Sequence, residues 1–171
     1  FVVSAFSQAT VTFISQNYGA GQIERCKKVF RQTMLLSVTS CAILNGFFVW
    51  QKELAIGIFT SSPEVFRFAT LRMEIVLLTQ SLACSYEIAG AALRGLGYSM
   101  LPAILTVFGT CVLRLFWVYV ICPLFPTFEA LMIIYPISWI VTGAAVCIAY
   151  HIIQKKLFIP EKAYNLLNGN N

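Results

Sequence analysis

Long apolar runs, separated by short polar breaks, divide this chain. Four of the runs reach spanning length and cover, in order, about residues 29–50, 66–93, 101–122 and 128–153. A helix needs about 20 residues to cross a hydrocarbon core of about 30 Å. Because a bilayer offers no partner for free backbone N–H and C=O groups, each run is predicted to be helical. The pattern therefore predicts an all-α polytopic transmembrane bundle over residues 1–154, with a partial helix at 1–16 and a tail at 155–171.

The breaks between the runs carry residues that end and start helices. Two of them are rich in glycine: QNYGAGQ at 16–22 and GLGYS at 95–99, whose residues of interest are Gln16, Asn17, Gly19, Gly21, Gly95 and Gly97. In SSPE, Ser62 is predicted to cap a helix that begins at Pro63. Pro102 lies at the start of a run, where proline is tolerated. Pro136 lies inside the last run and is predicted to kink it.

The composition places the chain in a membrane. Hydrophobic residues make up 58% of the chain and charged residues 11%, against about 25% charged in a typical soluble domain. Lipid is the solvent that would cover the excess apolar surface. Most of the six cysteines lie inside apolar runs, so reduced thiols are predicted. The lone histidine, His151, lies at the end of a run beside basic residues, which favours an interfacial role.

The basic residues indicate the orientation of the bundle. Alternate loops place eight basic residues on one side: Arg25, Lys27, Lys28, Arg31, Arg94, Lys155, Lys156 and Lys162. The other side has two or three. By the positive-inside rule, the eight lie in the cytoplasm, as does the C-terminal tail. The net charge of +5 is then an orientation signal, and no basic patch with interleaved aromatic residues points to nucleic acid.

Three charged residues fall inside predicted spans, where charges are costly and often functional. They are Glu74, Glu87 and Arg114. By helical rise, either carboxylate lies within about 10 Å of the depth of Arg114, so the sequence leaves its partner open. Glu74 could equally pair with Arg72 or lie at the outer rim. Glu87 is balanced between a structural ion pair and ion coupling, and for Arg114 a structural pair or a snorkelling side chain is the favoured interpretation.

Uncharged polar residues also lie inside the runs. Thr79, Gln80 and Ser81 precede Glu87, and Asn45 lies deep in the run at 29–50. They predict either hydrogen bonds between helices or a polar cavity. No Cys/His spacing indicates a metal site, so metal binding stays unknown, and no cofactor is expected. An integral membrane enzyme would need clustered His, Asp or Cys near an interface, and the sequence shows none; we expect no enzymatic activity.

Four stretches together resemble the multidrug and toxic compound extrusion (MATE) transporters. They are ISQNYGAGQIERCKKVFR, IFTSSPEV, EIAGAALRGLGYSMLP and YPISWIVTG, in family order. The resemblance implies two six-helix lobes facing a central cavity. This chain would then be most of the second lobe, from the end of helix eight through helices nine to twelve. The first lobe would lie elsewhere in a longer chain. The position acidic in some cation-coupled members falls near Ala83 here, and Glu87 is one turn nearer the loop.

The resemblance implies a function and a location. We expect a proton- or sodium-coupled antiporter that exports organic, often cationic, compounds across the cell (plasma or inner) membrane. Its partners would be the lipid bilayer, small organic substrates and the N-terminal lobe of the same chain, with no nucleic acid. Two alternatives stay open, a lipid-linked glycan flippase of related architecture and a non-transporting membrane subunit. Arg94 is expected to anchor its helix end at the cytoplasmic surface, near the C-terminal end of the helix dipole.

Overall fold

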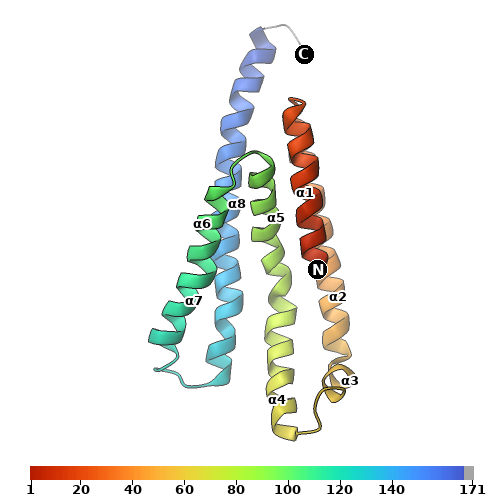
Figure 1. Cartoon of the computed structure of the whole chain (residues 1–171), viewed down its shortest axis with the longest axis vertical. Coiled ribbons are helices and arrows are strands. Elements are labelled where there is room, and N and C mark those ends of the chain that lie inside the picture. The colour runs from red at the N-terminus through yellow and green to blue at the C-terminus, as the bar shows by residue number, and fades with distance from the viewer. Residues whose placement is uncertain (168–171) are drawn as a thin grey trace.

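A computed structural model describes the backbone of residues 1–167 and the side chains of residues 1–157. It is an elongated bundle of roughly parallel helices (Figure 1). Across the described residues, four helices are long and apolar enough to cross a membrane: Ile23–Trp50, Pro63–Gly95, Met100–Ile121 and Phe128–Leu157. The prediction of an all-α polytopic bundle is confirmed.

Two of the spanning helices are single stretches of α-helix, and two contain other helical geometry. The first helices are α1 (Val2–Gly19), α2 (Ile23–Trp50) and the short α3 (Lys52–Gly57). The run predicted at 66–93 consists of α4 (Pro63–Arg72), the π-helix η1 (Met73–Leu77), the 3₁₀ turn η2 (Gln80–Leu82) and α5 (Ala83–Gly95). The run predicted at 101–122 consists of α6 (Met100–Thr106), the π-helix η3 (Val107–Val112), α7 (Leu113–Phe116) and the π-helix η4 (Trp117–Ile121). The last helix is α8 (Phe128–Leu167).

Helix ends differ from the predicted ones where polar residues continue a helix. The helix predicted at 29–50 begins at Ile23, because Ile23, Cys26 and Phe30 recur at helical spacing and are buried. The helix α8 continues past 153 to Leu167, so the polar composition after Lys155 marks no helix end among the described residues. The rest of the predicted tail, 168–171, lies outside the described residues. Pro136 lies within α8, and the helix continues on both sides of it. The predicted kink at Pro136 stays a prediction.

The predicted side-chain cap at Ser62 is wrong. Ser62 is the N-cap residue of α4 with extended backbone, but its side chain makes no capping hydrogen bond. Instead its backbone N–H donates to Oγ1 of Thr60 at 3.2 Å. The other two predicted features of this helix start are present, with Pro63 in the first helical turn and Glu64 beside it. Proline supplies the helical φ angle without a lost N–H, so α4 can begin here without a side-chain cap.

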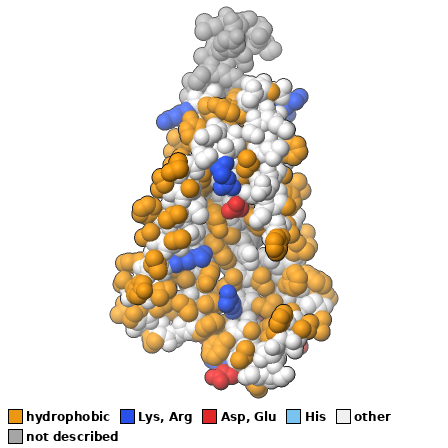
Figure 2. Space-filling view, viewed as in Figure 1, with side chains coloured by type: hydrophobic (Ala, Val, Ile, Leu, Met, Phe, Trp, Pro, Cys, Tyr) orange, Lys and Arg blue, Asp and Glu red, His pale blue; other side chains and the backbone are white. Residues whose placement is uncertain are grey.

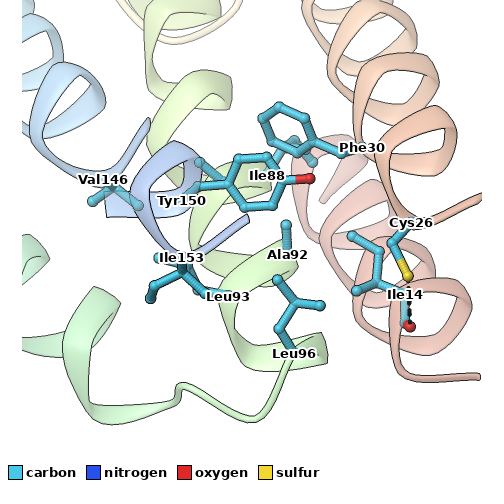
Figure 3. Packing of buried hydrophobic residues seen from close by; sticks show 11 residues of the cluster. Ile14, Cys26, Phe30, Ile88, Ala92, Leu93, Leu96, Val146, Tyr150 and Ile153 are labelled. Atoms are coloured by element: carbon cyan, nitrogen blue, oxygen red, sulfur yellow. Dashed lines mark hydrogen bonds between the residues drawn. The ribbon is translucent and has the colours of Figure 1, made fainter. Parts of the chain in front are cut away.

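The buried core lies where α1, α2, α5 and α8 meet (Figure 3). The rings of Phe30 on α2 and Tyr150 on α8 stack with centroids 4.0 Å apart. The Sγ of Cys26 donates to the backbone oxygen of Ile14 at 3.6 Å, which joins α2 to α1. Small residues of α5 fill the space between these larger side chains. All six cysteines are free thiols, as predicted.

Glycines allow the helices to approach closely. A Cβ built on Gly95 would lie 2.9 Å from Cβ and Cγ2 of Ile14, so α5 meets α1 nearly backbone to backbone. A Cβ on Gly109 would lie 2.1 Å from Oγ1 of Thr142, which places η3 equally close to α8. The two turns at the same end of the bundle use glycine for another reason, because Gly21 and Gly97 have φ of 71° and 91°.

The surface of the bundle is mostly apolar. Figure 2 shows hydrophobic side chains over most of the face in view, with a few basic and acidic side chains among them. Large exposed apolar residues occur on every spanning helix, including Leu35, Leu78, Phe108 and Ile148. A monomeric soluble protein rarely exposes so much contiguous apolar surface. The chain is therefore a multi-pass membrane protein.

Candidate functional site

Glu87, Arg94 and Ser7 form a polar network between α5 and α1. The Oγ of Ser7 donates to Oε1 of Glu87 at 3.1 Å. Nη2 of Arg94 donates to the Oγ of Ser7 at 3.1 Å and lies 3.5 Å from Oε1 of Glu87. Ser7 is 6% exposed, whereas the side chains of Glu87 and Arg94 are 37% and 39% exposed. The network is therefore closed on the Ser7 side and open on the other.

The course of the Arg94 side chain explains the contact with Glu87. Arg94 lies seven residues after Glu87, which is about two helical turns. To reach back, its guanidinium passes Gly90, where a Cβ would lie 3.5 Å from Nη1. The same Cβ would lie 3.5 Å from Cβ of Pro102, in the first turn of α6. Gly90 thus leaves room for Arg94 between α5 and α6.

From the sequence, Glu87 and Arg94 are assigned separate roles. In the structure they form one ion pair. Arg94 was expected to anchor the helix end, but its guanidinium turns back along α5 to a carboxylate. Glu87 lies eight residues before Gly95, about 12 Å from the helix end by helical rise. An acidic group at this depth gains from a nearby cation. The spacing Glu-x₆-Arg was the signal available in the sequence.

Glu74 is part of a second ion pair. Its Oε1 bonds to Nζ of Lys52 at the start of α3, and the side chains of Lys52 and Glu74 are 31% and 41% exposed. The partner is therefore neither Arg72 nor Arg114, the residues considered from the sequence. Pairs at this exposure contribute about 0–1 kcal/mol. The Lys52–Glu74 pair connects the start of α3 to η1.

Arg114 has polar and aromatic partners on α8. Its Nε donates to the Oγ of Ser138 at 3.0 Å, and its guanidinium carbon lies 4.5 Å from the ring centroid of Tyr135. Among the described residues, no carboxylate is ion-paired with Arg114. Arg114 also borders a surface groove of about 440 Å³ together with Thr110 and Tyr119. The guanidinium of Arg114 thus contacts an aromatic ring and a hydroxyl. Its other N–H groups can still bind an anion.

The polar residues before Glu87 lie where the helix departs from α geometry. Thr79 donates from Oγ1 to the backbone oxygen of Ile75 at 2.5 Å, a bond within its own helix. Gln80 and Ser81 belong to the 3₁₀ turn η2, which begins three residues after the last residue of the π-helix η1. Irregular turns of this kind often occur at functional sites and hinges. Asn45 lies on α2, half-buried.

The motif residues at the first break build a tight turn. The backbone N–H of Ala20 donates to the oxygen of Gln16 at 3.1 Å, and that of Gln22 donates to the oxygen of Asn17 at 2.8 Å. Nδ2 of Asn17 donates to the backbone oxygen of Phe13 at 2.7 Å. These bonds satisfy carbonyls at the end of α1 and reverse the chain into α2.

No metal centre is formed by the described residues, since no group of three or more His, Cys, Asp or Glu side chains comes together there. The chemistry available at the Glu87 network is that of one carboxylate, one guanidinium and one hydroxyl. Such a set can exchange a proton or accept a cation at the carboxylate.

A comparison with protein families shows to which family the chain belongs. The model of the MatE family matches residues 1–120, which include α1 through most of η4. The chain belongs to the MatE family. MatE proteins are membrane transporters, so the match indicates a transporter of that type. The matched residues contain Glu87, Arg94 and Arg114. No sequence among the curated proteins matches this chain.

Proposed function

We propose that this MatE chain belongs to the second lobe of a cation-coupled antiporter that exports organic, often cationic, compounds. Entry of protons or sodium ions would drive the export. Membership of the MatE family supports a transporter. The observation that carries the coupling is the Glu87 carboxylate, which lies inside a spanning helix with one side open and a displaceable cation, Arg94, beside it.

The coupling step follows from electrostatics. A carboxylate inside the membrane is stabilised by a nearby positive charge, and at Glu87 that charge comes from Arg94. A proton or a sodium ion that reaches Oε1 neutralises Glu87 and weakens the attraction of Arg94. Because Ser7 bonds to both groups, the change also alters the contact between α1 and α5. Binding of the ion thereby changes how two helices pack.

Transport would follow from alternating access. In this proposal the second lobe rocks against an N-terminal lobe of the same chain, and the substrate lies between them near the bilayer midplane. The C-terminal tail is cytoplasmic, as the positive-inside rule indicates. The location would be the cell membrane, such as the bacterial inner membrane. Bilayer lipid and small organic substrates would be the partners, with no cofactor beyond the coupling ion.

One observation favours a second candidate, a lipid-linked glycan flippase. Arg114 presents unused N–H donors beside a groove within a spanning helix, and a guanidinium binds phosphate groups well. Glycan carriers linked to lipid contain such phosphates. A flippase is expected to have several cations facing its cavity, and Arg114 alone is weaker support than the Glu87 network gives to the antiporter.

The deciding experiment uses vesicles that contain the full-length transporter and a fluorescent organic cation. A sodium gradient and a pH gradient are imposed separately, and dye export is followed. Export driven by either gradient supports the antiporter and names its ion. No export under both gradients contradicts it, and movement of a lipid-linked sugar in the same vesicles would then support the flippase. If neither substrate moves, a non-transporting subunit is the remaining interpretation.

A further inference from the structure

A groove of about 680 Å³ lies along α2, lined by residues that take no part in the Glu87 network. Its lining includes the polar residues Lys28, Arg31 and Gln32 and the apolar residues Met34, Leu35 and Val38. The two kinds of residue are separated along the helix. The positive charges lie toward the start of α2, and the apolar side chains follow one to two turns deeper in the bundle.

The two cations of the groove are available to a ligand. Lys28 and Arg31 are both exposed and lie one helical turn apart. The acidic residue in the first turn of α2, Glu24, is bonded to Lys27 at 3.0 Å. Within the described part of the chain, no carboxylate is ion-paired with Lys28 or Arg31. The groove therefore presents two uncompensated positive charges.

Further positive charge comes from α8 at the same level. The ring of Phe30, which also lines the groove, stacks on Tyr150 and meets the ring of His151 edge-on with centroids 6.4 Å apart. Lys155 follows His151 by one turn on α8 and is exposed. The cations of α2 and α8 thus belong to one end of the bundle.

We propose that this groove is a binding site for an anionic phospholipid. The phosphate would bind between Lys28 and Arg31, where a guanidinium can donate two parallel hydrogen bonds. An acyl chain would lie on Met34, Leu35 and Val38. Val38 lies seven residues after Arg31, about 10 Å deeper by helical rise, which suits a lipid whose charge and chains are separated along the membrane normal. Clusters of Lys and Arg beside the cytoplasmic end of a transmembrane helix attract such headgroups.

Charge complementarity favours a lipid over a protein segment in this groove. A helix packed there would bury the two cations, and it would need its own carboxylates to compensate them. An anionic lipid supplies the negative charge and the apolar tail in one molecule. Zwitterionic lipid has the same tail, so the groove should discriminate between lipids by headgroup charge.

The test measures lipid binding to the full-length transporter in mixed micelles of phosphatidylglycerol and phosphatidylcholine. Native mass spectrometry counts the bound lipids, and phosphatidylglycerol with a diazirine in its acyl chain maps the contact by photolabelling. We expect labelled peptides around Met34–Val38 and a preference for phosphatidylglycerol. The double variant Lys28→Gln/Arg31→Gln should reduce that preference by about fivefold for each charge removed.

A matched control removes the same charge from the same end of the bundle. Arg25 and Lys156 are exposed and do not line the groove, so Arg25→Gln/Lys156→Gln should retain the labelling of α2. A third variant, Leu35→Trp, fills the apolar part and should lower labelling with all charges present. Equal losses in the two double variants, or labelling unchanged in both groove variants, would overturn the site. Absence of any label on α2 in the unmodified protein would mean that another segment covers the groove, and would also overturn it.

Discussion

Nη2 of Arg94 lies 3.5 Å from Oε1 of Glu87, two helical turns earlier on the same helix, and Ser7 of α1 hydrogen-bonds to both side chains. The negative charge of Glu87 is therefore compensated by an arginine on its own helix, and the carboxylate is hydrogen-bonded to a serine on a neighbouring helix. Its surroundings differ from those of a surface ion pair, since the third partner is buried. A change in the charge of Glu87 has two consequences, one for Arg94 and one for the α1–α5 contact.

The variant Glu87→Gln tests whether this carboxylate couples ion movement to export. Glutamine keeps an oxygen that can accept the hydrogen bond from Ser7, so the α1–α5 contact should persist. The charge that binds the ion is lost. We expect gradient-driven dye export to fall by about tenfold or more, with its pH dependence abolished or shifted. Export from vesicles of the full-length transporter, measured across a range of pH, gives the answer.

Glu87→Asp is the matched control for that variant, because it retains the charge on a shorter side chain. Partial export with some pH dependence is expected from it. Normal transport by Glu87→Gln with an unchanged pH profile would remove Glu87 from the mechanism.

The variant Gly95→Ala should destabilise the bundle. Its new Cβ would lie 2.9 Å from Ile14 and 3.1 Å from the backbone oxygen of Val11, and a backbone atom cannot turn aside as a side chain can. We expect a loss of about 1–3 kcal/mol in the free energy of unfolding. Gly46→Ala on α2 is the control, since nothing lies within 4 Å of its Cβ. It should be neutral or stabilise by up to about 1 kcal/mol. Thermal unfolding in detergent compares them, and equal stability of the two variants would contradict the close α1–α5 approach.

The contact between Gly109 and Thr142 can be tested with a double-mutant cycle. Gly109→Ala places a Cβ 2.1 Å from Oγ1 and 3.2 Å from Cγ2 of Thr142, so it should cost about 1–3 kcal/mol. Thr142→Ala removes both of those atoms, at the expense of the hydrogen bond from Oγ1 to the oxygen of Ser138. In the double variant, part of the loss should be recovered. Additive losses in chemical or thermal unfolding would show that η3 and α8 do not touch at this point.

Arg114 should depend on the shape of its side chain as well as on its charge. Its Nε binds Ser138 while its plane lies over Tyr135, and a lysine cannot make both contacts in the same geometry. Arg114→Lys should therefore lose about 0.5–2 kcal/mol of stability, close to the loss in Tyr135→Leu. Tyr135→Phe keeps the π face and should be nearly neutral. Thermal unfolding of these variants decides, and full stability of Arg114→Lys would argue against the stacked contact.

The sequence predicted the spanning helices and their breaks well, because both depend on local composition. The run predicted at 101–122 corresponds to Met100–Ile121, and the glycine-rich breaks contain Gly21 and Gly97, the two glycines with positive φ. The matched family was also identified from motifs that survive in order along the chain. The roles of Gln80, Thr79, Ser81 and Asn45 in a cavity stay predictions.

The partners of the charged residues could not be predicted, because they depend on how the helices are rotated against one another. Depth alone left Arg114 equally near Glu74 and Glu87, yet its contacts are Ser138 and Tyr135. Glu74 pairs with Lys52, which is far from it in sequence. The π-helical stretches were missed as well, since an apolar run has the same composition whether its backbone bonds close α or π turns.

The π-helix η3, Val107–Val112, also bears on how this transporter could change through evolution. A π turn holds one residue more than the α turn it replaces. Elsewhere in a membrane helix, loss of a single residue rotates everything beyond it by about 100° and turns side chains toward the wrong neighbour. Within η3 such a deletion can be absorbed when the turn tightens to α geometry. Arg114, which lies after η3, would then keep its face toward α8 in a descendant with a shorter helix.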